Sequence, residues 1–167
     1  MTGGNLLAYS IAAPLVMAFV VNLFGRGRSG LVAALAMASL AVSALCSFLL
    51  LARVLREGPE SYTMGGWQPP WGIELVVDPL SGLMLFLVAA VALVATWSAG
   101  ASAAQELEGR EHVFFTLYLI LVSGLLALTV TGDAFNLYVM LEITAITTYG
   151  LIAMGRERAA LASFNSV

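Results

Sequence analysis

The sequence predicts an all-α membrane protein that crosses the bilayer several times. Of its 167 residues, 60% are hydrophobic and 10% are charged, whereas a soluble domain carries about 25% charged residues. The hydrophobic residues form long runs, and one of these runs contains a carboxylate, Glu142. The net charge of −3 comes with no lysine and offers no basic face, so nucleic acid is not an expected partner.

Five runs are long enough to span a bilayer, which takes about 20 residues of helix. They cover residues 5–24, 30–52, 80–103, 113–130 and 134–154, and a sixth begins near Ala159. Backbone groups in lipid must be satisfied within the segment, so helices are expected. The prediction is therefore about five full transmembrane helices plus the start of a sixth, in a single membrane domain over residues 1–167. The first run lacks a positively charged leader, so it is expected to be a retained anchor helix.

A small external β-hairpin is predicted between the second and third helices, within residues 57–78. Residues 73–77 have strand composition, and residues 62–64 are the expected partner strand. Trp67 and Trp71 lie between them and are expected at the depth of the lipid headgroups. Asp78 and Pro79 then form a typical helix start, with Asp as the N-cap and Pro at the first helical position.

Other loops give weaker signals. Asp133 is the expected N-cap of the fifth helix at the membrane interface, and a functional role is the alternative. The glycine and charges of residues 155–158 predict a helix stop. His112 is expected to be a solvated loop residue rather than a proton relay, and Cys46 a small residue within an apolar run.

The distribution of arginine predicts the orientation. With the N-terminus outside, the inner loops hold Arg26, Arg28, Arg110, Arg156 and Arg158. The outer segment then holds two arginines, at positions 53 and 56. Because inner loops are enriched in positive charge, the N-terminus and the hairpin are expected outside.

Glu142 is the candidate functional residue. It lies eight residues after Ala134, or about 12 Å into the helix, which is close to mid-bilayer. A charge at this depth costs roughly 2.5–3.5 kcal/mol, and intramembrane acids usually mark ion or proton routes. Tyr138, one helical turn away, is a possible hydrogen-bond partner. The alternative is a structural role, in which Glu142 is buried between helices and makes a hydrogen bond that supports their packing.

The sequence contains no motif for a redox cofactor or a metal. It has one cysteine and one histidine, no glycine-rich phosphate loop and no Ser/His/Asp set. No cofactor is therefore expected, and the chain is not expected to be catalytic alone.

Three motifs resemble the antiporter-like membrane subunits shared by Mrp-type cation/proton antiporters and respiratory complex I (NADH-quinone oxidoreductase), above all the Mrp D subunits. The first covers residues 65–67, 71–74 and 77–81, around the hairpin. The second, residues 132–142, resembles the family's fifth-span signature. The third, residues 160–165, resembles the start of its sixth span.

The resemblance implies a site and partners. In this family the fifth-span Glu, here Glu142, pairs with a sixth-span lysine, whose expected position is Asn165. Asn cannot supply that positive charge. Family members have about fourteen spans and work in multi-subunit assemblies, which implies a bacterial or archaeal inner-membrane location, with lipid, other membrane subunits, protons and a cation such as sodium as partners.

Two functions therefore stay open. The first is an antiporter-like subunit, or part of one, that takes part in proton or cation/proton translocation through Glu142. The second is a non-transporting scaffold, in which small residues such as Ala34 and Ala38 dock neighbouring subunits. An unrelated channel is a third and weaker reading.

Overall fold

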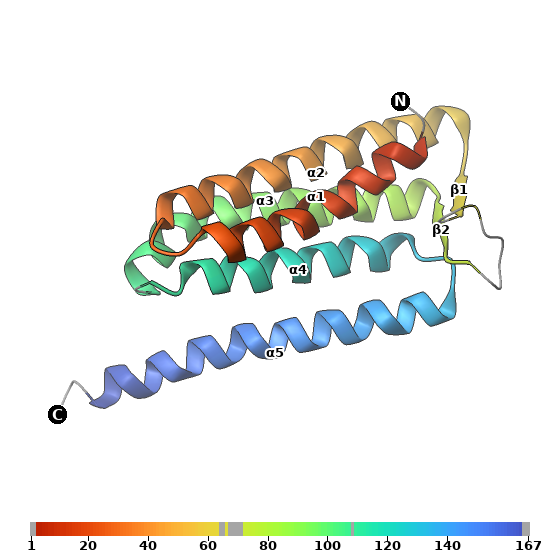
Figure 1. Cartoon of the computed structure of the whole chain (residues 1–167). Coiled ribbons are helices and arrows are strands. Elements are labelled where there is room, and N and C mark those ends of the chain that lie inside the picture. Colours follow the sequence, from red (N-terminus) through yellow and green to blue (C-terminus); the bar gives the residue numbers. More distant parts are fainter. Residues whose placement is uncertain (1–2, 64–65, 67–71, 108, 165–167) are drawn as a thin grey trace.

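The computed structural model describes residues 3–63, 66, 72–107 and 109–164. It has five long helices, each with a stretch long and apolar enough to cross a membrane (Figure 1). This confirms the predicted multi-pass all-α architecture. Their bounds are α1 Gly3–Phe24, α2 Ser29–Glu57, α3 Pro79–Glu106, α4 Glu111–Val130 and α5 Ala134–Phe164.

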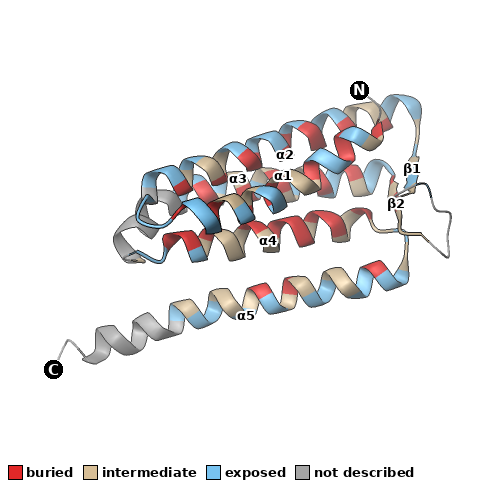
Figure 2. Cartoon of the chain, viewed as in Figure 1, coloured by how far each residue is buried: buried red, intermediate tan, exposed pale blue. Residues whose placement is uncertain are grey.

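Helices α1 to α4 pack into one bundle, and α5 lies against α4 at its edge (Figures 1 and 2). The core of the bundle consists of aliphatic side chains that are almost fully buried, among them Val21, Leu40, Leu85, Leu119 and Leu126. Helices in lipid gain little from the hydrophobic effect, so packing and interhelical hydrogen bonds hold them together.

Within the described residues, four hydrogen bonds join helices of the bundle, each from a side-chain hydroxyl to a carbonyl of another helix. Three of these bonds end on α1, and one ends on α3. The pairs are Ser43 to Ser10, Ser123 to Ile11 (2.9 Å), Thr116 to Ala18 (3.3 Å) and Tyr118 to Ala92 (3.0 Å). All four helices of the bundle are therefore linked by hydrogen bonds as well as by packing.

The predicted hairpin is present, with β1 Glu60–Thr63 antiparallel to β2 Glu74–Val77. The register pairs the first residue of β1 with the last of β2, and the two strands stand at the same end of the bundle as the N-terminus (Figure 1). Arg53 at the end of α2 contacts Glu57 at 2.8 Å and Glu60 at 2.7 Å, which ties α2 to β1. Trp67 and Trp71 lie outside the described residues.

The predicted helix stop at residues 155–158 is wrong. Helix α5 continues without a break to Phe164, so no separate sixth helix begins near Ala159. The stretch apolar enough to cross a membrane nevertheless ends at Gly155, close to the predicted limit. The physical reason is that Gly155 adopts a helical conformation and is followed by Arg, Glu and Ala, which all favour helix.

The sequence suggested that His112 is solvated, but the residue is buried, with 8% of its surface exposed. It lies in the first turn of α4, beneath the turn between α1 and α2. A Cβ atom added to Gly25 in that turn would lie 3.1 Å from the His112 Cβ atom. Flanking charges suggested a loop, but the helix already begins at Glu111 and turns this side chain inward.

Candidate functional site

The start of α5 is a capped helix end. The Asp133 carboxylate accepts hydrogen bonds from the backbone N–H groups of Phe135 (3.0 Å) and Asn136 (3.3 Å). These are two of the N–H groups that a helix start leaves without a partner. The Asn136 side chain is 3% exposed and donates to the Thr131 hydroxyl at 2.5 Å. The connection from α4 and the first turn of α5 therefore form one hydrogen-bonded unit.

The hairpin also contacts this unit, which sequence reasoning missed. Thr131 and Leu75 form an isolated antiparallel bridge, and the Gly132 N–H donates to the Glu74 carbonyl at 2.9 Å. A Cβ atom at Gly132 would lie 2.8 Å from the Val76 Cγ2 atom. Glycine after the fourth span was the one signal of a close approach, but nothing local identified β2 as its neighbour.

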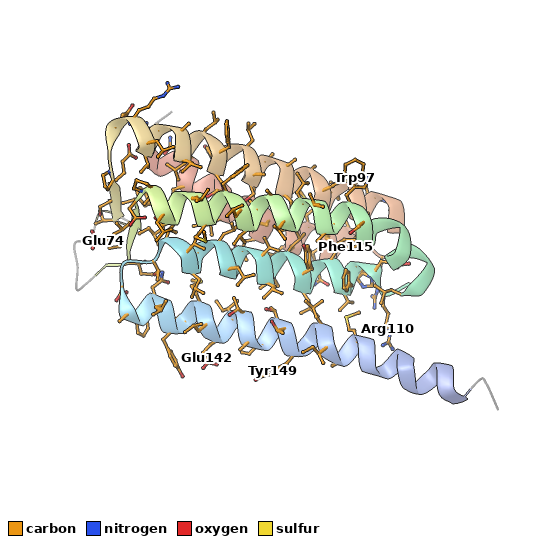
Figure 3. The ribbon with its side chains drawn as sticks, turned by 180° about the vertical axis from the view of Figure 1, so that it is seen from behind. Glu74, Trp97, Arg110, Phe115, Glu142 and Tyr149 are labelled. Carbon is orange, nitrogen blue, oxygen red and sulfur yellow. The ribbon has the colours of Figure 1, made fainter. Side chains whose placement is uncertain are left out.

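Glu142 lies two helical turns further along, on the face of α5 that the other four helices leave open. It is exposed, as is Tyr149 seven residues later, and Figure 3 shows both on the side turned away from α4. Tyr138 lies one helical turn before Glu142 on the same side of α5, and its hydroxyl interacts with the Glu142 carboxylate. Phe135 and Ile146 complete this stripe at helical spacing, and both are exposed. The stripe is called the Glu142 face below.

The threonines of α5 lie elsewhere. Thr144 and Thr147 are buried on the opposite side of the helix. Their hydroxyls donate to carbonyls of α5 itself, Leu141 at 2.8 Å for Thr144 and Ile143 at 2.7 Å for Thr147. Thr148 likewise donates to the Thr144 carbonyl at 2.7 Å. They therefore satisfy their own helix and do not add polar groups to the Glu142 face.

The position expected to hold the partner of Glu142 is not described, because Asn165 lies outside the described residues. Within the part of the chain that the structure describes, no three His, Cys, Asp or Glu side chains gather as a metal site. Glu142 and Tyr138 form a polar pair on the Glu142 face. A carboxylic acid with one hydroxyl partner can accept and release a proton or attract a cation.

The start of α3 is capped by a reciprocal pair. The Ser81 N–H donates to the Asp78 carboxylate at 2.6 Å, and the Asp78 N–H donates to the Ser81 hydroxyl at 2.8 Å. Pro79 is the first helical residue, where a missing N–H costs nothing. The hydrogen bonds from Ser81, first from its backbone and then from its side chain, lower the pKa of Asp78. Its contribution to the helix start is present above the usual carboxyl range and is lost as the pH falls through that lowered pKa.

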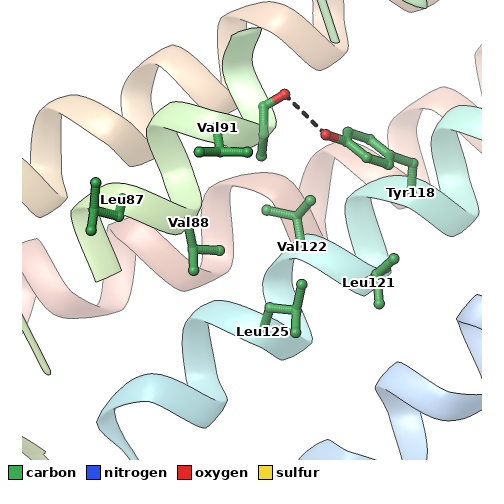
Figure 4. Close-up of a pocket in the computed structure, with 8 residues that line it drawn as sticks. Leu87, Val88, Val91, Tyr118, Leu121, Val122 and Leu125 are labelled. Carbon is green, nitrogen blue, oxygen red and sulfur yellow. Dashed lines mark hydrogen bonds between the residues drawn. The ribbon is translucent and has the colours of Figure 1, made fainter. Parts of the chain in front are cut away.

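A separate apolar pocket of about 310 Å³ lies between α3 and α4 (Figure 4). Tyr118 is the one polar side chain among the lining residues, and its hydroxyl donates to the Ala92 carbonyl at 3.0 Å. The pocket has no charged lining residue and does not include Glu142. It is lined by Leu87, Val88, Val91, Ala92, Tyr118, Leu121, Val122 and Leu125.

Known proteins are similar to this chain in sequence and in fold. The NADH-quinone oxidoreductase subunit N of Desulforudis audaxviator is 43% identical over 126 residues, 75% of this chain and 25% of that protein. The D subunit of the Na(+)/H(+) antiporter of Alkalihalophilus pseudofirmus is 30% identical over 151 residues, 90% of this chain and 30% of that protein. The chain is a partial-length homologue of these antiporter-type subunits.

A solved structure extends the likeness to the fold. A chain of the membrane-bound sulfane sulfur reductase, an archaeal respiratory membrane complex, matches with a TM-score of 0.79 and 29% identity. The match covers 86% of this chain and 29% of that one. No family model matches the sequence. The chain thus spans between a quarter and three tenths of the antiporter-type subunits it resembles, and these come from complexes with several subunits.

Proposed function

We propose that the chain takes part in proton or cation/proton translocation as an antiporter-like subunit, or part of one, in a multi-subunit membrane complex. The homology with antiporter and NADH-quinone oxidoreductase subunits supports this class. The observation that carries the proposal is Glu142, an exposed acid inside the spanning stretch Ala134–Gly155 of α5. Protons and a monovalent cation such as sodium are the proposed cargo, and no redox chemistry is assigned to the chain.

The place of Glu142 argues against the packing alternative. A charged side chain inside a bilayer is stable when it faces a polar partner or a water-filled cavity. Within the described residues, Tyr138 supplies one hydroxyl and the bundle supplies no cation beside it. The other polar partners that the Glu142 carboxylate needs must come from further helices of the assembly. A carboxyl that these helices bring into and out of contact with charge would change its proton occupancy, which is the step that couples ion movement.

The decisive variant is Glu142→Gln, because the amide keeps the size of the side chain and cannot lose a proton. We expect proton or sodium flux in vesicles carrying the whole complex to fall about 100-fold, as for loss of a group required at every turnover. Glu57→Gln is the matched control, since Glu57 is exposed at the end of α2. Full flux from Glu142→Gln in an assembled complex would reject the proposal.

The scaffold function remains the alternative, and one observation favours testing it. Ala34 and Ala38 are one turn apart on α2, spaced so that another helix could approach closely. Ala38→Leu should then reduce assembly with neighbouring subunits, measured by co-purification, whereas Glu142→Gln should leave both assembly and flux intact.

We further propose that the hairpin end of the bundle faces the outside. The N-terminus and both strands lie at that end, and the turn with Arg26 and Arg28 lies at the other (Figure 1). A cysteine placed at Ser61 should react with a membrane-impermeant maleimide added outside intact cells, and one placed at Arg28 should not. The reverse pattern would invert the orientation.

A further inference from the structure

We propose that Gly132 is a positioning residue for Glu142, through which strand β2 fixes the start of α5 and so sets the depth and rotation of the carboxylate. The inference rests on the proposed function for the role of Glu142, but the contact between β2 and the start of α5 is independent of it. It assigns the hairpin a task beyond connecting α2 to α3.

Strand β2 is itself a fixed support. Leu75 and Val77 point into the core and are almost fully buried, and the strand packs against α3 and α4. The chain leaving α4 comes alongside this strand, through the bridge of Thr131 to Leu75 and the bond from the Gly132 N–H to the Glu74 carbonyl. The link between α4 and α5 is thus held against β2 by one bridge and one backbone hydrogen bond.

Gly132 is required by space rather than by backbone conformation. Its φ is not among the positive values in the described residues, so an L-residue could adopt its conformation. A Cβ atom there, however, would meet Val76 Cγ2 at 2.8 Å and the Glu74 carbonyl oxygen at 3.3 Å. The second neighbour is backbone and can move only if β2 moves. Any side chain at this position therefore pushes the start of α5 away from the strand.

The displacement would reach Glu142 because the intervening segment is rigid. The Asp133 cap and the bond from Asn136 to Thr131 fasten the first turn to the link. Ala134 to Glu142 is then two turns of continuous helix, about 12 Å long. Beyond this anchor α5 packs mainly on α4, and 11% of its spanning stretch is buried, against 44% for α4. The anchored start and the packing on α4 are therefore what hold Glu142 in place.

The test measures the surroundings of Glu142 directly. A hydrophobic carbodiimide reacts with protonated carboxyl groups within membranes, and the modified peptide can be quantified by mass spectrometry over a range of pH. In native membranes holding the whole complex, Gly132→Ala should shift the midpoint of Glu142 labelling by about 0.5 pH unit or more, because a displaced carboxylate meets different neighbours. Ion flux should fall about 10-fold or more, since small misplacements of a reacting group are costly.

Gly155→Ala is the matched control on the same helix, because nothing lies within 4 Å of the added methyl group. It should leave both labelling and flux unchanged. Val76→Ala in the Gly132→Ala background removes the nearer obstruction and should bring the labelling midpoint back toward the native value. If Gly132→Ala does not accumulate, the double variant should restore accumulation.

The outcomes separate this inference from the proposed function. A Gly132→Ala protein whose labelling profile matches the native one would overturn the positioning role, even if Glu142→Gln abolishes flux. A failure of Val76→Ala to rescue either labelling or accumulation would also count against it. A shifted profile together with full flux from Glu142→Gln would support the positioning role and reject the proposed function instead.

Discussion

Helix α5 and the helices of the α1–α4 bundle each contain a stretch long and apolar enough to cross a membrane, yet they are attached to the protein in different ways. In the bundle, hydroxyl groups such as those of Ser123 and Tyr118 donate to carbonyls of neighbouring helices. The hydroxyl groups of Thr144, Thr147 and Thr148 in α5 donate to their own helix. The bundle is therefore joined from side to side, whereas α5 is held by one packed face and by its anchored start.

This difference shows which part of the protein provides partners for its own polar side chains and which part does not. The buried hydroxyl groups of the bundle have partners that the bundle provides, which is how polar side chains are accommodated in lipid. On α5, Glu142 and Tyr149 are exposed and point away from α4 (Figure 3), and Tyr138 is exposed as well. Helix α5 carries the candidate site, and other helices must therefore supply the remaining contacts around Glu142.

Truncation of a leucine should separate the two regions most strongly. Leu119 in α4 is fully buried, while Leu141 in α5 is 48% exposed. Leu119→Ala should lower the free energy of unfolding by about 2–3 kcal/mol, at the lower end of the values for soluble cores because lipid replaces part of the lost transfer energy. Leu141→Ala should change it by less than about 0.5 kcal/mol. Unfolding in mixed detergent micelles measures both, and equal losses would contradict the comparison.

A glycine at the α4–α5 contact offers a way to detach α5 alone. A Cβ atom at Gly124 would lie 2.9 Å from Thr144 Cγ2 and 3.6 Å from Ile143 Cγ2. Gly124→Leu should therefore weaken this contact by about 1–3 kcal/mol, the usual effect of overpacking. Hydrogen exchange should rise in α5 and stay unchanged in α1 and α2. Gly155→Leu serves as the control, because a Cβ atom at Gly155 meets nothing within 4 Å. Faster exchange in all five helices of the Gly124→Leu variant would mean that α5 is part of the bundle after all.

The sequence predicted the features that depend on neighbouring residues. The five spans follow from run length, and the two strands follow from composition between glycines and prolines. The helix starts after Asp78 and Asp133 involve residues within three positions of the capping carboxylate. Such signals are readable in one sequence because each is complete within a few residues.

Features that depend on distant residues could not be predicted in this way. The contact of Gly132 with Glu74 joins residues 58 positions apart, and periodicity along α5 does not say which face meets α4. The burial of His112 depends on the turn between α1 and α2 lying over it. The stop expected at residues 155–158 was wrong because a glycine ends a helix only where the chain turns away, which the following residues do not require.

The smallest expected difference concerns single hydroxyl groups. Ser123→Ala removes the bond from α4 to the Ile11 carbonyl of α1, and interhelical bonds of this kind contribute on average about 0.6 kcal/mol. Thr148→Val removes a bond within α5, and its effect should be close to zero because the Thr144 carbonyl retains its helical N–H partner. A loss on Thr148→Val as large as that on Ser123→Ala would show that the hydroxyls of α5 also bind the bundle, and the contrast between the two regions would then rest on packing alone.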